Sequence, residues 1–532
     1  MLPRVTSLLT LALAAAALSN AQTVSPKRDC AQLLQFDAPA VEFSEAEPVP
    51  AGAGMPSYCL VQGTINKRIG AGGHQFGIGF ELRLPDSWTE RFLFQGGGGM
   101  DGVVRPATGA VPISGSTAIP ALARGFAVAS TDSGHQGQGG PFAAASDSSF
   151  GIDQQARVDQ AYGGFIAVTE LARRMVASYY GRPWKKAYFM GCSNGGRQAL
   201  LAAQRFPLEF DGVLSAAPAS RVGTATISSV WEIIAFSDIA PKDSAGHPIL
   251  SKAFSNGDLT LLGKAVADAC DAMDGVKDGL IFNTNECRFD PAVLACPGDK
   301  TDACLSTRQV AVLKKVFSGP KNSRGEALYS DWPYDTGVAA PGWRALKLGT
   351  SETAASNSAD VTLMFSGLKG FFFTPPDQNF DPMKFNFDTD PARLSDTSVL
   401  QDSMLTFLST FSEHGNKLML IHGMSDPFFS AYDTARYYQR VVQANGGLNS
   451  TMPWVRFFEI PGMNHCGGGP ALEDFDPLTA LVQWTEEDRA PEQMMAKGRS
   501  FPGVSRPVCA YPAFPRYRGA GSRDDGANFD CK

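Results

Sequence analysis

The sequence lacks the features that would place the protein on nucleic acid or in a membrane. It has no cluster of basic residues, and its 46 lysines and arginines are outnumbered by 53 aspartates and glutamates. This balance argues against nucleic acid and anionic lipid as partners. After residue 21 it has no uninterrupted apolar run of about 18 residues, the length that a membrane-spanning helix needs. It also has no internal repeat, and its composition is that of a globular enzyme.

The first 21 residues have the features of a secretory signal peptide. Arg4 precedes an apolar run from residue 8 to residue 18, and the small-residue exit Ser19-Asn20-Ala21 follows. The run is too short for a membrane span. We therefore expect cleavage near Ala21 and a secreted or periplasmic mature protein.

The chain has ten cysteines and no C-x-x-C spacing of the kind that binds zinc. An even number in an exported chain predicts five disulfides. Sequence alone does not determine which cysteines pair, but short loops favour Cys270 with Cys287, Cys296 with Cys304, Cys509 with Cys531, and Cys30 with Cys59. Cys192 and Cys466 then remain for each other, unless they are two unrelated buried thiols.

The order of strand-like and helix-like segments predicts an α/β fold. Strand-like runs at 77–84, 91–94 and 125–129 precede a segment with helical periodicity at 152–180. A strand at 186–190, a tight turn, a helix at 197–205 and a strand at 211–217 follow. Strand, helix, strand, turn and helix in this order indicate a parallel sheet covered by helices.

The pattern changes between about residue 223 and residue 395, where cysteines, prolines and aromatic residues accumulate and strand character is missing. Strand character returns at 417–421. We therefore predict four segments: a signal peptide (1–21), the first part of an α/β-hydrolase core (22–222), an inserted lid domain (223–395) and the second part of the core (396–532).

The stretch GCSNGG at 191–196 fits the G-x-S-x-G pattern. It lies between a strand and a helix, as a nucleophile elbow does, and its glycines allow the sharp turn that exposes the serine hydroxyl. Ser193 is therefore the predicted nucleophile.

A nucleophilic serine needs a histidine as base and a carboxylate that orients it, in the chain order Ser, Asp or Glu, His in this fold. The chain has six histidines. His422 ends the predicted strand in IHGMSDPFF and is interpreted as structural. Asp426 follows in the next loop, and only His465, in PGMNHCGGG, comes after it. The predicted triad is Ser193, Asp426 and His465, and a Cys192–Cys466 bond would hold the histidine loop against the elbow.

Two further groups of residues suggest an oxyanion site and a cation site. Oxyanion donors are expected from the backbone N–H groups of Asn194 and of Gly98, in the loop Gln95–Gly99, with Gly97 as the alternative. The segment CDAMDGVKDGLIF at 270–282 offers oxygen ligands of the type that Ca²⁺ prefers, although it does not match an EF-hand and could equally be a solvated acidic loop. Its candidate ligands are Asp271, Asp274, Val276, Asp278 and Leu280.

With these motifs in order, the sequence resembles the tannase and feruloyl esterase family, whose mark is a CS…D…HC constellation. The resemblance extends over nearly the whole mature chain and includes the GGGG loop, CDxxDGxxDG and PGMNHC. It implies an α/β-hydrolase fold with a lid, a bond between Cys192 and Cys466, calcium in the acidic loop, and a lid that contacts the aromatic ring of the acyl group.

The stretches HGMSDPFFSAYDTARYYQR and PGMNHCGGGP are similar in particular to a bacterial branch of this family that hydrolyses mono(2-hydroxyethyl) terephthalate, a breakdown product of PET. In that branch a lid arginine holds the free carboxylate of the substrate, and Asp360 aligns with it here, which disfavours such a substrate. Phe429 matches a pocket aromatic of the branch. Met364 and Phe365 are further candidates for the acyl pocket, as are Trp332 and the run Phe371–Phe373.

We therefore expect a secreted serine esterase that cleaves small esters of aromatic acids, of the feruloyl or galloyl type, through an acyl-enzyme. Hydrolysis of terephthalate half-esters is the alternative, and a serine peptidase or a non-catalytic binder on the same fold is a weaker one. No organic cofactor is expected, and nothing in the sequence predicts an oligomeric state.

Overall fold

The computed structural model describes residues 23–532 except residues 139, 140 and 285. The predicted signal peptide and its cleavage point near Ala21 lie outside the described residues. Within them, no helix combines the length and the apolar character that crossing a membrane requires.

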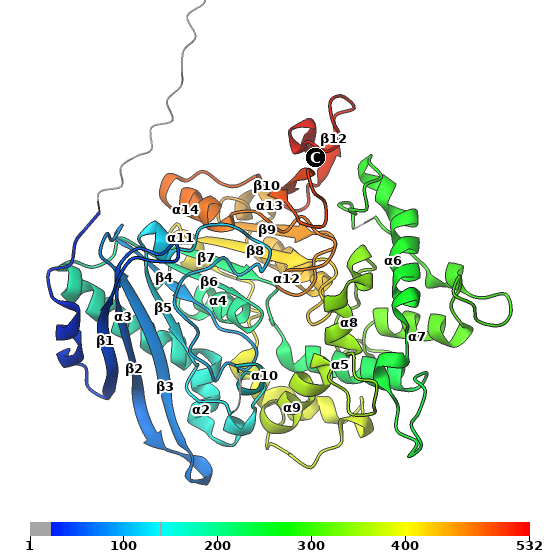
Figure 1. Cartoon of the computed structure of the whole chain (residues 1–532), viewed down its shortest axis with the longest axis horizontal. Helices are drawn as coiled ribbons and strands as arrows, with labels where there is room; N and C mark the ends of the chain where they lie inside the picture. The colour runs from blue at the N-terminus through cyan, green and yellow to red at the C-terminus, as the bar shows by residue number, and fades with distance from the viewer. Residues whose placement is uncertain (1–22, 139–140, 285) are drawn as a thin grey trace, which may run out of the picture.

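A nine-stranded sheet forms the centre of the molecule, with the strand order β1-β2-β3-β5-β4-β6-β7-β8-β9 (Figure 1). From β5 to β9 all neighbouring strands are parallel, whereas β1, β2, β3 and β5 pair antiparallel. The strands are β1 (Val41–Val49), β2 (Tyr58–Ile69), β3 (Gln75–Pro85), β4 (Arg91–Gln95), β5 (Ala127–Thr131), β6 (Lys186–Cys192), β7 (Gly212–Ala216), β8 (Lys417–Gly423) and β9 (Val455–Ile460).

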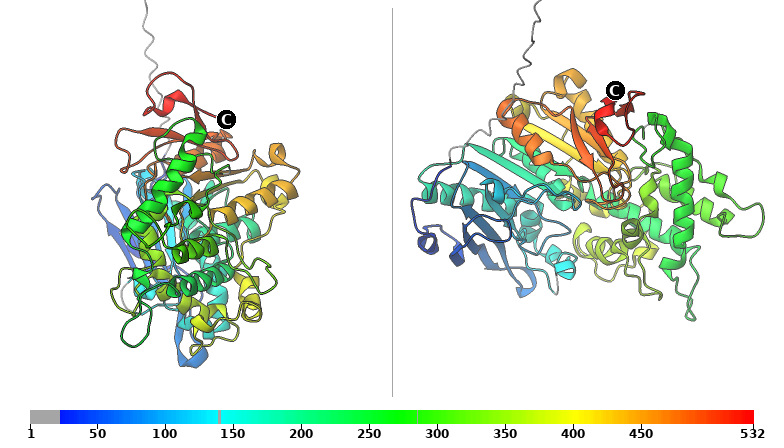
Figure 2. Two further views of the ribbon diagram at one scale, coloured as in Figure 1. Left: turned by 90° about the vertical axis from the view of Figure 1, so that its right-hand side faces the viewer. Right: turned by 45° about the horizontal axis from the view of Figure 1, so that its top comes forward.

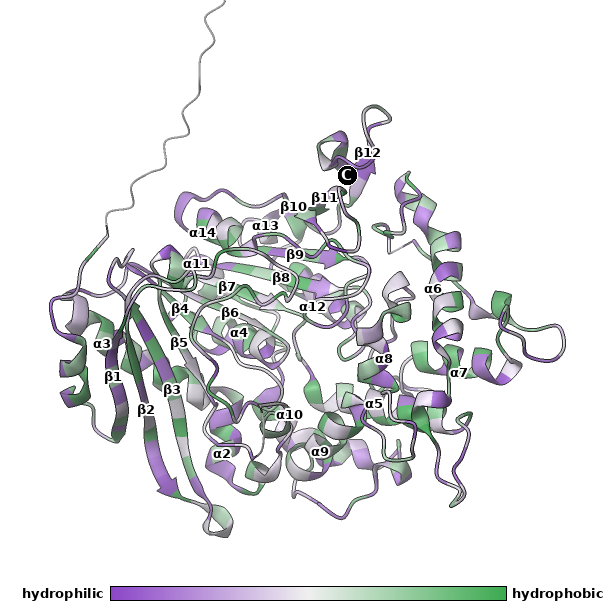
Figure 3. Ribbon diagram, viewed as in Figure 1, coloured by the Kyte–Doolittle hydropathy of each residue, from purple (hydrophilic) through white to green (hydrophobic). Residues whose placement is uncertain are grey.

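The sheet confirms the predicted α/β class and adds an antiparallel edge that was not predicted. Only residues 70–74 separate β2 from β3. A connection this short can join only antiparallel strands, because a parallel pair needs a long crossover. β2 and β3 continue beyond the rest of the sheet, and in Figure 3 the far end of β2 is hydrophilic, in agreement with its exposed residues.

Helices cover both faces of the parallel part of the sheet. One face carries α3 (Gly164–Tyr180), α4 (Asn194–Arg205) and α12 (Ala431–Ala444), whose apolar residues share one buried cluster with the strands. The other face carries α14 (Pro477–Glu487) and the hairpin of β10 (Gln493–Lys497) and β11 (Ser505–Cys509). Both faces of β6 to β9 are therefore buried, which explains why these strands consist of nearly continuous apolar residues.

The chain between β7 and β8 forms a separate helical mass beside the sheet (Figure 2). Its apolar residues pack into a cluster that also takes in Phe428 and Phe429 from the loop after β8. Its main helices are α5 (Val222–Ser237), α6 (Asn256–Cys270), α7 (Thr307–Phe317), α8 (Pro341–Lys347), α9 (Phe365–Gly367) and α10 (Ser395–Gln401). The short α11 (Ser409–Glu413), which precedes β8, packs instead in the apolar cluster of the sheet through Phe411. We call residues 223–395 the lid; its exact boundaries stay a prediction.

Five disulfides join the ten cysteines in the predicted pairs. Four of them close loops of 8 to 29 residues, whereas Cys192–Cys466 spans 274 residues. Such a set of bonds is typical of proteins that fold in an oxidising compartment.

Candidate active site

Ser193 lies in a sharp turn between β6 and α4, with the backbone angle φ at +63°. A non-glycine residue in this left-handed region is strained, as the nucleophile of an elbow is. The turn requires a glycine at position 195, because a Cβ atom there would lie 2.6 Å from the carbonyl oxygen of Gly97 and collide with it. The elbow and the glycine loop after β4 are therefore in direct backbone contact.

Asp426 and His465 meet beside this elbow at the ends of β8 and β9. The ring nitrogen Nδ1 of His465 lies 2.7 Å from Asp426 Oδ2. Asp426 also accepts the backbone N–H groups of Phe428 and Phe429 at 2.8 and 3.1 Å. Burial alone would raise the pKa of Asp426, but His465 and His422 outweigh it and hold that pKa well below its ordinary value. Asp426 is therefore an ionised carboxylate that fixes the orientation of the His465 ring.

The disulfide between Cys192 and Cys466 holds the histidine loop against the elbow, with 6.0 Å between the two Cα atoms. In the described part of the chain no hydrogen bond joins the side chains of Ser193 and His465. Such contacts are often long without substrate and tighten only in the reacting complex. The structure thus brings together the three predicted triad residues, and proton transfer between Ser193 and His465 stays a prediction.

The glycine loop after β4 borders Ser193. The N–H of Gly97 donates to Gln198 Oε1 at 3.2 Å, so it is already engaged. Gly99 and Asn194 line the cavity next to Ser193, whereas Gly98 is not among the lining residues. Gly99 is therefore the residue of this loop that borders the cavity, and the role of Gly98 as an oxyanion donor stays a prediction.

A buried network of polar side chains lies against the glycine loop. The Asn194 side chain donates from Nδ2 to Asp101 Oδ1 at 2.6 Å and accepts from Arg197 Nε at 2.7 Å. Asp101 also accepts from Gln198 at 2.8 Å. Burial raises the pKa of Asp101, although these donors partly offset the effect, and burial lowers the pKa of Arg197 to about 10. The network ties the glycine loop to the first turn of α4.

Ser193 opens into a narrow cavity, which we call the serine cavity. Most of its lining is apolar, and the lid and the loop after β8 supply all of its aromatic residues. Of the predicted pocket residues, Met364 and Phe429 line it, as do two members of the aromatic run, Phe371 and Phe372.

Other predicted pocket residues lie elsewhere. Phe365 follows the π-helical turn η10 (Asp360–Met364) and faces a different hollow, next to His247 and Pro248. The extra residue in a π turn shifts the side chains that follow, so that Met364 and not Phe365 reaches the serine cavity. Trp332 and Phe373 do not line it either.

Asp360 also lies outside the serine cavity, so it does not take the place of a substrate-binding residue. It is fully buried, accepts from Ser229 Oγ at 2.9 Å and pairs with Lys347 Nζ at 3.3 Å. Lys347 in turn pairs with the buried Glu232. A buried carboxylate requires such a partner, and here the partner is structural.

The structure adds site residues that the sequence did not reveal. His422, predicted to be structural, contacts the triad carboxylate, with Nε2 at 3.2 Å from Asp426 Oδ2 and 2.9 Å from the Phe429 carbonyl oxygen. Its position in the same short motif as Asp426 was the available signal. Gln160 and Gln401 line the serine cavity from distant segments, and no motif marks them.

The acidic loop of the lid buries Asp271 and Asp274 within electrostatic range of Asp278. Asp271 Oδ1 is buried without a hydrogen-bond partner, and its Oδ2 accepts from the N–H of Gly279 at 2.9 Å. Burial, together with repulsion from Asp278, raises the pKa of Asp274 to about 7 and also raises that of Asp271. Asp278 is paired with Arg506. The orphaned oxygen and the raised pKa values fit a loop that holds a cation.

Side chains alone do not complete a metal site there. Nowhere among the described residues do three acidic, histidine or cysteine side chains converge closely enough to hold a metal. Backbone carbonyl groups, for which Val276 and Leu280 are the candidates, would have to supply the remaining ligands.

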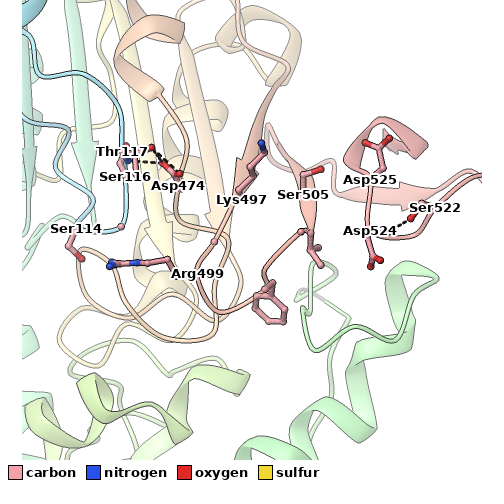
Figure 4. Close-up of a pocket in the computed structure, with 15 residues that line it drawn as sticks. Ser114, Ser116, Thr117, Asp474, Lys497, Arg499, Ser505, Ser522, Asp524 and Asp525 are labelled. Atoms are coloured by element: carbon pink, nitrogen blue, oxygen red, sulfur yellow. Dashed lines mark hydrogen bonds between the residues drawn. The ribbon is translucent and has the colours of Figure 1, made fainter.

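A second, open cleft of about 790 Å³ lies between residues 114–117 and the hairpin of β10 and β11 (Figure 4). Ser114, Thr117, Asp474, Lys497 and Arg499 lie on its walls. It contains none of the predicted catalytic residues, so the smaller serine cavity is the candidate active site.

Known proteins match this chain over most of its length. Residues 59–532 match the family model described as tannase and feruloyl esterase. Mono(2-hydroxyethyl) terephthalate hydrolase from Piscinibacter sakaiensis is 39% identical over 532 residues, which cover 92% of this chain and 87% of that protein. A protein named "Probable feruloyl esterase" from Arthroderma benhamiae is 28% identical over 100% of this chain and 98% of its own length.

A comparison with solved structures finds the same fold in this family. The crystal structure of feruloyl esterase B from Aspergillus oryzae superimposes with a TM-score of 0.77 at 24% identity, over 94% of this chain and 99% of that one. This likeness supports the α/β-hydrolase fold with a lid that was predicted. Together with the family match, it shows that the chain belongs to the tannase and feruloyl esterase family of carboxylic ester hydrolases.

Proposed function

We propose that the protein hydrolyses esters of small aromatic carboxylic acids, of the feruloyl or galloyl type, at Ser193. The observation that carries this proposal is the serine cavity: a strained serine beside an Asp426–His465 pair opens into a space lined by Phe371, Phe372 and Phe428. Aromatic side chains favour a planar acyl group through stacking and edge contacts.

In the proposed mechanism, Ser193 Oγ attacks the ester carbonyl carbon while His465 Nε2 accepts the hydroxyl proton. Asp426 stabilises the imidazolium that forms. The backbone N–H groups of Asn194 and Gly98 stabilise the negative oxygen of the tetrahedral intermediate. His465 then protonates the departing alcohol, and a water molecule, activated by the same histidine, releases the acid from the acyl-enzyme.

Hydrolysis of mono(2-hydroxyethyl) terephthalate is the second candidate, because a relative of that name is 39% identical. The cavity disfavours it, since none of its lining residues is an arginine, a lysine or a histidine that could pair with the free carboxylate of that substrate.

The Ser193→Ala variant tests the mechanism. We expect kcat on methyl ferulate or methyl gallate to fall by about 10⁶-fold, as it does when a triad serine is lost. A panel of methyl ferulate, methyl gallate, mono(2-hydroxyethyl) terephthalate and p-nitrophenyl butyrate separates the candidates. Preference for the terephthalate half-ester would overturn the assignment of substrate, and near-normal turnover by the variant would overturn the role of Ser193.

We also propose that Asp271, Asp274 and Asp278, with the carbonyl groups of Val276 and Leu280, bind a structural Ca²⁺ ion. The unpartnered Asp271 Oδ1 and the raised pKa of Asp274 support this. The ion would hold the acidic loop closed and takes no part in the chemistry. An N-terminal signal peptide and export, which the five disulfides support, are part of the same proposal.

A further inference from the structure

Two glutamines stand out in the lining of the serine cavity. Gln160 belongs to the π-helical turn η5 (Asp159–Gly163), and Gln401 is the last residue of α10. They are only 2% and 1% exposed, and both line the cavity. No acidic or basic side chain accompanies them in that lining. The only other polar side chains among the described residues that line the cavity are those of Ser193 and Asn194 at the elbow.

The two side-chain amides form one hydrogen bond with each other, and this bond does not use all of their donors and acceptors. Gln401 Nε2 donates to Gln160 Oε1 at 2.8 Å. This leaves Gln401 Oε1 enclosed and without a donor. Gln160 Nε2 makes no hydrogen bond within the described part of the chain. Rotating both amides by 180° would again leave one free donor and one free acceptor. The pair therefore offers one of each to a ligand in the cavity.

Arg197 fixes this pair relative to the nucleophile. Its guanidinium is fully buried and donates to the backbone carbonyl oxygens of Gln160 at 3.1 Å and of Gln401 at 3.4 Å. Its Nε donates to the side chain of Asn194, the residue after Ser193. One rigid side chain thus connects both glutamines to the first turn of α4, so the free amide groups are preorganised with respect to Ser193.

We propose that Gln160 and Gln401 form a subsite that recognises a hydroxyl group on the aromatic ring of the acyl moiety. This inference rests on the proposed function and specifies its substrate as a phenolic acid ester. A phenolic hydroxyl donates one hydrogen bond and accepts others, so it satisfies both free amide groups at once. A ring hydrogen or a methyl group leaves Gln401 Oε1 unsatisfied, and a carboxylate, which only accepts, is repelled by that oxygen.

The test compares methyl esters that differ only at the ring: cinnamate, its 2-, 3- and 4-hydroxy derivatives, and 4-carboxycinnamate. The readout is the ratio of kcat/KM for the best hydroxycinnamate to kcat/KM for cinnamate. We expect a ratio of about 10 or more for the wild type, because a site built for a hydroxyl group discriminates against its absence. The 4-carboxy ester should be the poorest substrate.

In the Gln401→Met variant, which keeps the side-chain length and removes the amide, the ratio should fall to near 1. Met364→Leu is the matched control, because Met364 lines the same cavity without a polar group; it should keep the wild-type ratio. If Gln401→Met does not fold, product inhibition of the wild type gives the same information: 4-hydroxycinnamate should inhibit about 10-fold more strongly than cinnamate.

A wild-type ratio near 1, or an unchanged ratio in Gln401→Met, would overturn the subsite and leave the aromatic-ester activity standing. Failure of the wild type to hydrolyse any ester of the series would overturn the proposed function and the subsite with it.

Discussion

Asp426 has the most contacts with other residues of the candidate active site. It accepts hydrogen bonds from two backbone N–H groups of the loop that follows it, and its Oδ2 contacts both His465 and His422. The second histidine is fully buried, and its Nδ1 lies 2.8 Å from Thr434 Oγ1. With Nδ1 accepting from that hydroxyl, Nε2 carries the proton and donates toward the carboxylate and the Phe429 carbonyl. His422 therefore holds the carboxylate that contacts His465, the proposed base.

We predict that His422→Leu lowers kcat on an aromatic ester by about 100-fold with little change in KM, because Asp426 can then shift relative to His465. His422→Gln keeps an N–H donor and should recover part of the loss. Steady-state kinetics of purified variants provide the measurement.

The control for this prediction is His414→Gln, since His414 is exposed just after α11 and β8 (Lys417–Gly423) separates it from Asp426. It should retain wild-type kcat. If His422→Leu lowers the melting temperature but keeps kcat, the residue is structural only, as its place at the end of a strand suggests.

Some residues of the site can be predicted from the sequence, and others cannot. Ser193 and His465 lie in local motifs whose spacing follows from the turn and the catalytic order. Gln160 and Gln401 carry no motif, because they become neighbours only when two segments 241 residues apart pack together. Phe365 and Met364 are adjacent in sequence, and only the local helix geometry decides which of them reaches the cavity.

At the level of elements, the nucleophile elbow is predictable and the π-helical turns are not. A strand, a glycine turn and a helix give a clear pattern, and β6 and α4 begin and end within three residues of the predicted bounds. The helix predicted at 152–180 is divided in the structure by η5, which carries Gln160 into the cavity. One extra residue in a turn barely changes the spacing of apolar residues, so periodicity does not reveal it.

The acidic loop of the lid is the element whose stability we expect to depend on calcium and pH. The pKa of Asp274 is raised to about 7 in the folded state, above its unfolded value of about 3.9. The folded protein then binds more protons than the unfolded one between these values, so without calcium its stability falls as the pH rises from about 4 to 7. Bound Ca²⁺ would replace the lost protons.

We therefore predict that EDTA lowers the melting temperature at pH 8 and has a much smaller effect at pH 5. Restoring free calcium to 100 times its Kd should raise the free energy of unfolding by about 2.7 kcal/mol. Differential scanning calorimetry with and without EDTA measures these melting temperatures. Asp274→Asn should abolish the response, whereas Asp302→Asn, at an exposed position of the lid, should keep it. An unchanged melting temperature at pH 8 would exclude a stabilising cation.

At the scale of the whole molecule, the candidate active site lies where the sheet and the lid meet. The sheet supplies Ser193 and the loops with Asp426 and His465, and the lid supplies Met364, Phe371 and Phe372. The proposed nucleophile and base, Ser193 and His465, are 272 residues apart in sequence. Their distance in space is secured by the one disulfide that connects distant parts of the chain, Cys192–Cys466.

This bond should contribute to both stability and catalysis, and a matched disulfide in the same chain separates the two effects. On the chain-entropy model a loop of 274 residues gives about 5 kcal/mol and a loop of 8 residues about 2.5 kcal/mol. Replacing Cys192 and Cys466 by alanine should therefore destabilise the protein more than replacing Cys296 and Cys304, as measured by urea unfolding.

Catalysis gives the sharper distinction. Removing Cys192–Cys466 frees the loop of His465 from the elbow of Ser193, so kcat should fall by about 100-fold even at temperatures where the protein stays folded. Removing Cys296–Cys304, which lies in the lid away from the serine cavity, should leave kcat unchanged. Both variants lose one disulfide. If kcat falls only when Cys192–Cys466 is removed, that bond holds His465 in place next to Ser193. Equal kcat in both variants would mean that the packing of Phe428 against His465, whose ring centroids are 5.1 Å apart, is sufficient to hold the base in place.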